Sequence, residues 1–170
     1  MTLRPTLALL AGLLLLAPGC ASYRLGSMLP DDLRTVHVPT CVNQTSEPLV
    51  EQDVTAAILS QIQTDGTLRI AGPEDADAVL EVVLIQFWLD PVAYAKGESS
   101  TANQYRMSIR ASFSLRRRST NQVVVESPGI VGWHDFDFAG DMTSSKAVAL
   151  RPAADDLGRR ILNRIVQYWP

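Results

Sequence analysis

The clearest pattern in the chain is a strict alternation of apolar and polar side chains between residues 105 and 116. The apolar positions are Tyr105, Met107, Ile109, Ala111, Phe113 and Leu115, and the polar ones between them are Arg106, Ser108, Arg110, Ser112, Ser114 and Arg116. Because successive side chains of a strand point to opposite faces, this alternation predicts a strand with one buried and one solvated face. Residues 119–122 are typical of a turn, and 123–127 is predicted to be the returning strand of a hairpin.

Two further segments are predicted to be strands. Residues 35–40 are short, rich in β-branched side chains and closed by a proline, whereas 75–91 is long and mostly apolar. Alternation along the longer segment directs Leu80, Val82 and Leu84 toward one face. It directs Val83, Ile85, Phe87 and Leu89 toward the opposite face, together with Glu81. This second face is too apolar to be left bare in water, so either another part of the chain or a partner must cover it.

Two amphipathic helices are expected. In 43–66, apolar residues recur every four positions, at Val50, Val54, Ile58 and Ile62. Thr45 or Ser46 is expected to cap the start of this helix, and Gly66 to end it. The C-terminal segment shows a similar stripe from Pro152 onward. Since an interior proline kinks or breaks a helix, the sequence leaves open whether that helix reaches back to Lys146.

These elements predict an α+β fold with the order β-α-β-β-β-α. We expect a two-layer sandwich in which a small mixed or antiparallel sheet of about four strands carries two amphipathic helices on one face. Residues 35–170 form a single domain. The segment 132–141, rich in Asp, Gly and aromatic residues, is interpreted as a loop.

The N-terminus indicates export and acylation. The apolar run 6–17 is about 12 residues long, short of the ~20 that a membrane-spanning helix needs, and only Arg4 precedes it. Ala17 and Gly19 stand just before Cys20, which resembles a bacterial lipobox. We therefore predict a signal peptide at 1–19, an acylated Cys20 and a short tether at 20–34. The alternative is an ordinary signal peptide with Cys20 incidental.

Composition and motifs exclude several functional classes. The chain carries 18 acidic and 15 basic residues, a net charge of −3, which argues against nucleic-acid binding. No nucleophile elbow or phosphate-binding loop occurs. His134, Asp135 and Asp137 are close in sequence, but zinc sites usually draw His or Cys from several places, so we expect no metal, no cofactor and no catalysis. With Cys20 acylated, Cys41 has no cysteine to pair with.

The order of the motifs resembles one known family. The succession is GCASYRLG, LRTVHVPTCVNQTSEP, QTDGTLRI, ADAVLEVVLIQF, DPVAYAKG, QYRMSIRASFSLRRRSTNQVV and AADDLGRRILNRIVQYW. It is similar to that of the LPS-assembly lipoproteins, the LptE family. The resemblance implies a non-enzymatic outer-membrane protein that lies inside or plugs a β-barrel translocon, the LptD-like partner, and helps deliver lipopolysaccharide to the cell surface. Ala21 after the cysteine also favours the outer membrane, by analogy with lipoprotein sorting.

The resemblance gives two sets of side chains a candidate role. The lipopolysaccharide-binding candidates are Arg106, Arg110, Arg116, Arg117 and Arg118, since arginine binds phosphate bidentately and Arg106 and Arg110 are about 13 Å apart along a strand. The alternative is ordinary solubilising charge. Val83, Ile85, Phe87 and Leu89 are candidates for contact with the barrel wall or with acyl chains, unless the chain itself covers them.

An alternative function is a lipid-tethered periplasmic regulator that activates a peptidoglycan synthase. Such a regulator needs a long linker to cross the periplasm. Only about 14 residues separate Cys20 from the first predicted strand, a reach of at most ~50 Å, which favours a partner in the same membrane.

Overall fold

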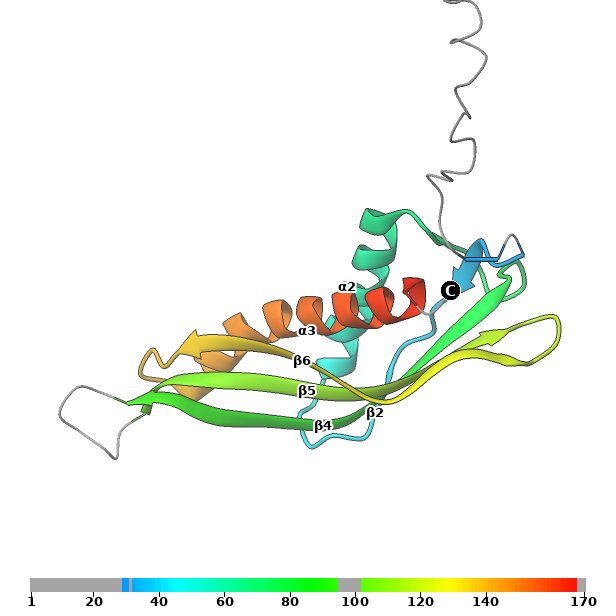
Figure 1. Ribbon diagram of the computed structural model, residues 1–170. Coiled ribbons are helices and arrows are strands. Elements are labelled where there is room, and N and C mark those ends of the chain that lie inside the picture. Colours follow the sequence, from blue (N-terminus) through cyan, green and yellow to red (C-terminus); the bar gives the residue numbers. More distant parts are fainter. Residues whose placement is uncertain (1–28, 31, 95–101, 168–170) are drawn as a thin grey trace, which may run out of the picture.

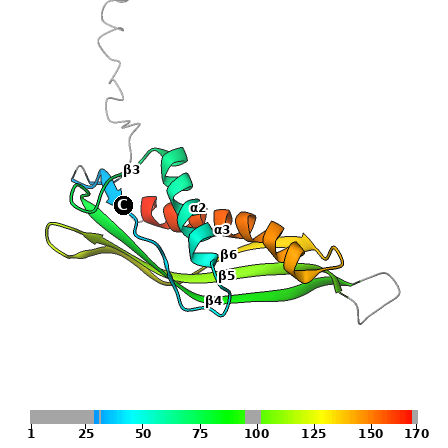
Figure 2. The same cartoon turned by 180° about the vertical axis from the view of Figure 1, so that it is seen from behind.

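The computed structural model describes residues 29–30, 32–94 and 102–167. One sheet carries two helices on one of its faces, which confirms the predicted α+β two-layer class (Figure 1, and Figure 2 from behind). The strands are β1 (Thr35–His37), β2 (Val42–Asn43), β3 (Arg69–Ile70), β4 (Ala78–Tyr94), β5 (Ala102–Arg117) and β6 (Val123–Asp137). The helices are α2 (Val50–Asp65) and α3 (Met142–Val166).

The sheet is mixed and has the order β3-β1-β4-β5-β6, with β2 also paired to β4. The three short strands pair in parallel, whereas the three long ones form an antiparallel meander. The two predicted hairpin strands and the long strand before them are therefore confirmed. Strands β2 and β3 were not predicted, because two residues each are too few to show a period.

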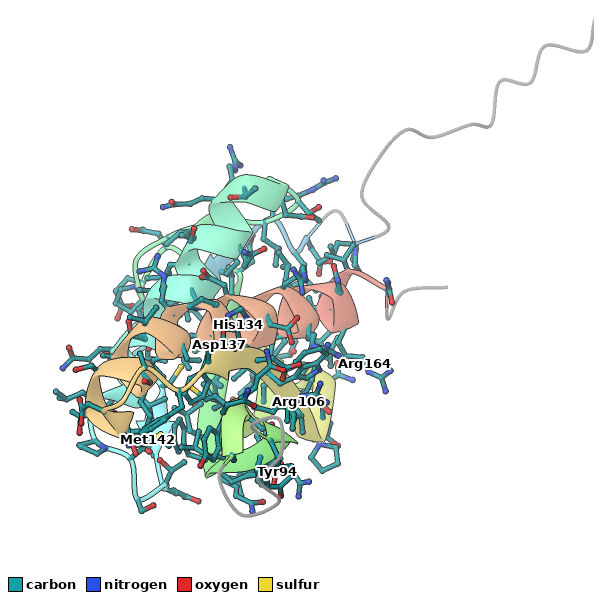
Figure 3. All side chains as sticks on the ribbon, turned by 90° about the vertical axis from the view of Figure 1, so that its left-hand side faces the viewer. Tyr94, Arg106, His134, Asp137, Met142 and Arg164 are labelled. Carbon is teal, nitrogen blue, oxygen red and sulfur yellow. The ribbon has the colours of Figure 1, made fainter. Side chains whose placement is uncertain are left out.

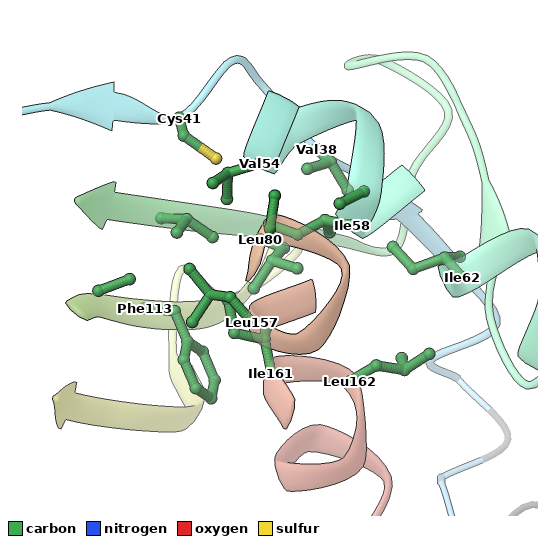
Figure 4. Close-up of a cluster of buried hydrophobic side chains, with 14 of the residues drawn as sticks. Val38, Cys41, Val54, Ile58, Ile62, Leu80, Phe113, Leu157, Ile161 and Leu162 are labelled. Carbon is green, nitrogen blue, oxygen red and sulfur yellow. The ribbon is translucent and has the colours of Figure 1, made fainter. Parts of the chain in front are cut away.

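Helix α2 buries the predicted stripe: Val50, Val54, Ala57, Ile58 and Ile62. Its side chains meet those of α3 and of the sheet in one core (Figure 4). Gly66 ends the helix in the left-handed region, at φ 72°, as expected. The predicted cap at Thr45 or Ser46 is wrong. The helix begins after Leu49 without a side-chain cap, and Asn43 instead binds the preceding turn through Thr45 N and Glu47 O.

Helix α3 is continuous through Pro152, which answers the question that the sequence left open. The Asp141 carboxylate caps its start by accepting a 2.7 Å hydrogen bond from the backbone N–H of Ser144. The proline removes the bond that residue 152 would donate to the Val148 carbonyl. Val148 is 77% exposed, so this turn lies on the solvent side, where water can satisfy the carbonyl. Neither of the two described helices is long and apolar enough to span a membrane.

The prediction of a loop at 132–141 is wrong for its first half, because β6 runs on to Asp137. Gly132 explains why the strand was missed in the sequence and why α3 lies so close to β6. A Cβ there would lie 2.5 Å from the Cα and Cβ of Leu157, so the missing side chain allows α3 to pack directly on the strand. The inward positions carry Gly132 and His134 instead of large apolar residues, and the strand pattern is hidden for that reason.

Candidate ligand-binding face of the sheet

The face of β4, β5 and β6 opposite the helices, here termed the outer face, carries the candidate site. Along β5 the five inward side chains from Met107 to Leu115 are all buried. The alternating residues from Arg106 to Arg116 lie on the outer face, as the sequence predicts. Figure 1 shows that neither helix covers this face.

A β-bulge changes which part of β4 faces outward. The pairing with β5 passes from Leu84–Ala111 to Gln86–Arg110, so Ile85 is an extra residue. Beyond it, Phe87 is paired with Ile109 and Leu89 with Met107, and both partners are fully buried.

The expectation that Phe87 and Leu89 point to the outer face is therefore wrong. Both pack against the core, and the Lys146 Nζ lies 5.7 Å from the centroid of the Phe87 ring. Val83 lies opposite Ser112 on the outer face, as expected, and Ile85 is 41% exposed at the bulge.

The same bulge brings a tryptophan onto the outer face. Trp88, Ser108 and Trp133 are direct cross-strand neighbours on β4, β5 and β6. Ser108 is only 3% exposed although no helix covers it, which is consistent with shielding by the two flanking indoles. Sequence reasoning missed both tryptophans, because unbroken alternation assigns Trp88 to the helix side and Trp133 was placed in a loop.

Arg106 is held by its neighbours. Its Nε and Nη2 donate to the two carboxylate oxygens of Asp135 at 2.7 and 2.9 Å, and its guanidinium carbon lies 4.1 Å from the centroid of the Trp133 ring. The hydrogen bonds from Arg106 lower the pKa of Asp135, and the same bonds raise the pKa of Arg106. Asp90 is the cross-strand neighbour on the other side, so two carboxylates flank this cation. Figure 3 labels Arg106 on β5 together with His134 and Asp137 of the neighbouring strand β6.

Arg110 lies four residues further along β5, on the same face beyond Ser108, in different surroundings. Its guanidinium carbon is 5.6 Å from the centroid of the Trp88 ring, and Trp88 donates its indole N–H to Asp90 at 2.7 Å. The cross-strand neighbours of Arg110 are Gln86 and Val131, both uncharged. Within the described part of the chain no carboxylate pairs with this exposed arginine.

The other three candidate arginines lie about 33 Å from Arg106, at the opposite end of β5. Arg116 is 3.9 Å from Glu81 and donates to the Asn121 carbonyl. Arg117 pairs with Asp32, and Arg118 pairs with Glu74 at 2.8 Å. Arg116 thus binds the β5–β6 turn, Arg117 the N-terminal segment and Arg118 the connection between β3 and β4. The structure therefore separates the five predicted arginines into two groups and leaves one without a carboxylate.

Between the two groups the outer face is hollowed and acidic. The hollow has a volume of about 380 Å³ and is lined by residues that include Glu81, Val83, Ser114 and Glu126. Glu81 is already paired with Arg116, whereas Glu126 has no ion pair among the described residues, so the charge of this hollow is less favourable to an anion than the Arg110 end of the face.

The described residues contain no group of three or more potential metal ligands. Alternation along β6 places His134 on the inward side and Asp135 on the outer face, which separates the three residues considered for metal binding. Cys41 is a buried free thiol whose pKa is raised chiefly by burial, so it is unreactive core. Cys20 lies outside the described residues.

The family model of LptE, described as lipopolysaccharide-assembly, matches residues 33–165. The chain belongs to the LptE family. That match spans the described domain from Leu33, just before β1, almost to the end of α3. LptE-family membership gives the chain a role in lipopolysaccharide assembly and places it in a non-enzymatic family.

Solved structures share the fold of this LptE-family chain at low sequence identity. The PelC dodecamer from Paraburkholderia phytofirmans is 16% identical, with a TM-score of 0.52 over 83% of this chain and 92% of that one. A minor lipoprotein from Acinetobacter baumannii is 9% identical, with a TM-score of 0.52 over 80% and 94%. Lipoprotein B from Nitrosomonas europaea is 15% identical, with a TM-score of 0.50 over 85% and 86%. No curated protein matches the sequence significantly.

Proposed function

We propose that this chain is an acylated outer-membrane lipoprotein that associates with a β-barrel translocon of the LptD type and assists lipopolysaccharide transport by binding, without catalysis. Residues 1–19 are removed as the signal peptide and Cys20 carries the lipid. The domain from residue 35 onward then lies on the periplasmic side or within the barrel lumen.

The observation that carries the proposal is the uncovered outer face of a domain whose family assembles lipopolysaccharide. The helices bury one face of the sheet in a continuous core. The other face exposes Trp133, Arg110 and Ile85, with Trp88 and Arg106 half-buried beside them. A face with exposed aromatic and apolar side chains, rimmed by charge, is typical of an interaction surface.

The start of the domain supports attachment near the membrane. Leu29 and Leu33 are buried, so the chain joins the fold from residue 29 onward. Eight residues lie between Cys20 and Leu29, a reach of about 30 Å at full extension. An acylated Cys20 therefore keeps the domain close to its own leaflet, where an integral barrel is within reach.

The test is affinity purification of the full-length chain from detergent-solubilised outer membranes. Recovery of a large β-barrel protein supports the proposal, whereas recovery of a peptidoglycan synthase alone supports the regulator alternative. Cys20→Ala is expected to release the protein from the membrane, and Cys41→Ala, the matched loss of the other cysteine, is expected to leave it bound. Membrane retention of Cys20→Ala would contradict the anchoring.

A further inference from the structure

We propose that Arg110, in cation–π contact with Trp88, is the oxyanion-binding side chain of the outer face and that it takes a phosphate group of the glycolipid. The glycolipid as the source of that phosphate rests on the proposed function. The assignment of the site to Arg110, rather than to a pair formed with Arg106, rests on the structure.

The two arginines differ in whether neighbouring carboxylates compensate their positive charge. Arg106 lies between Asp90 and Asp135 across the strands and makes a bidentate ion pair with Asp135. An anion approaching Arg106 must compete with that pair and is repelled by both carboxylates.

Arg110 faces no such competition. It lies between Gln86 and Val131, and its side chain is exposed. An anion at Arg110 therefore displaces no carboxylate of the described residues.

The contact with Trp88 leaves the hydrogen-bonding capacity of Arg110 free. A cation–π contact engages the positive charge of the guanidinium rather than its N–H donors, and no hydrogen bond within the described residues uses the side-chain donors of Arg110. Those donors match two oxygens of one phosphate. Because Asp90 accepts the indole N–H of Trp88 at 2.7 Å, the ring is held in place beneath the cation. The cation–π contact favours conformers of Arg110 that lie near this ring, which lowers the entropic cost of binding.

Arg106 acts as a positioning residue in this arrangement. It stacks on Trp133 at 4.1 Å while Asp135 fixes its guanidinium. Trp133 and Trp88 then enclose Ser108 from both sides. These side chains form a packed row across the outer face beside Arg110.

The experiment measures binding of detergent-dispersed lipid A to the full-length protein, using diphosphorylated lipid A and its fully dephosphorylated form. Wild-type protein is expected to prefer the phosphorylated form, and Arg110→Gln to weaken that binding roughly 10- to 100-fold, the range of a lost charge-assisted contact. Arg110→Lys keeps the positive charge but loses the planar pair of N–H donors, so its affinity for phosphorylated lipid A is expected to lie between those of wild type and Arg110→Gln. Arg118→Gln is the matched control, since it removes an equal charge from an arginine that already has a carboxylate.

Equal binding of phosphorylated lipid A by Arg110→Gln and wild type would overturn the proposal, as would a wild type that does not discriminate between the two lipid A forms. A large excess of inorganic phosphate that displaces the lipid completely would overturn the glycolipid as the source. Circular dichroism of Arg110→Gln checks that the fold is intact. Recovery of the barrel by Arg110→Gln is measured separately, so the proposed function can stand even where this inference fails.

Discussion

Gly132 is the position where adding one methyl group tests the packing most directly. In Gly132→Ala the new Cβ would lie 2.5 Å from the Cα and Cβ of Leu157. Comfortable carbon–carbon contacts are about 3.5–4.0 Å, so α3 or β6 must move by about 1 Å. Backbone atoms cannot rotate out of the way as a side chain does.

The other side of α3 limits that movement. The adjacent Gly158 packs against α2, where a Cβ would lie 3.2 Å from the Ala57 carbonyl carbon. Helix α3 is therefore confined between β6 and α2 at one turn. Overpacked cores lose about 1–3 kcal/mol, and we expect Gly132→Ala to lie at the upper end, about 3 kcal/mol. At this chain length that is a fall in Tm of about 6–12 °C.

The assay is equilibrium urea unfolding of the full chain, with Gly129→Ala as the matched control. A Cβ at Gly129 would meet only the Arg110 Cδ, at 4.0 Å, and its backbone is outside the left-handed region. That control is expected to be neutral or up to about 1 kcal/mol more stable, because alanine restricts the unfolded chain. A loss below about 0.5 kcal/mol in Gly132→Ala would refute the argument that close backbone packing requires this glycine.

Two further predictions concern carboxylates that accept hydrogen bonds from backbone N–H groups. The Asp156 carboxylate accepts a hydrogen bond from the backbone N–H of Trp133 at 3.1 Å. Asp156→Ala leaves that donor without its partner, so we expect the free energy of unfolding in urea to fall by about 1–3 kcal/mol, and by less in Asp156→Asn. Equal losses in the two variants would contradict the role of the acceptor. The Asp77 pKa is lowered from 3.8, first by the hydroxyl of Thr35 and then by the backbone N–H of Arg34. A carboxyl group whose pKa is lower in the folded state stabilises the fold at pH values above its unfolded-state pKa. That stabilisation is lost as the pH falls through its folded-state pKa. The difference in the free energy of unfolding between wild type and Asp77→Ala should thus be constant above about pH 5 and shrink below pH 3.8. A difference that does not change with pH down to acid unfolding would contradict this prediction.

The sequence carried most of the fold because its regular elements are long. The alternation runs over twelve residues in β5, and the apolar residues of α2 recur every four positions. In both elements the hydrophobic pattern repeats often enough to show its period clearly. The two-residue strands β2 and β3 offer no such average. Their pairing depends on the surrounding fold rather than on local pattern.

The candidate site was harder to predict because it depends on register. One inserted residue, Ile85, moves Phe87 to the core and Trp88 to the outer face without changing the composition of the strand. Likewise, Arg106 and Asp135 are 29 residues apart, and only the pairing of β5 with β6 makes them neighbours. Sequence alternation gave the correct face for Arg106 and Arg110. It contained no information about which of the two already had a carboxylate.

The Asp77 carboxylate has a mechanical consequence for a domain attached by its N-terminus. Its Oδ2 accepts hydrogen bonds from the backbone N–H of Arg34 at 3.0 Å and of Thr35 at 2.8 Å, where the chain enters β1. Strand β1 is held on both sides, by β3 and β4. A force applied through the N-terminal segment first reaches the ion pair of Asp32 with Arg117 and then the Asp77 contacts. It then loads β1 along its length, so several hydrogen bonds must break together before the domain unfolds.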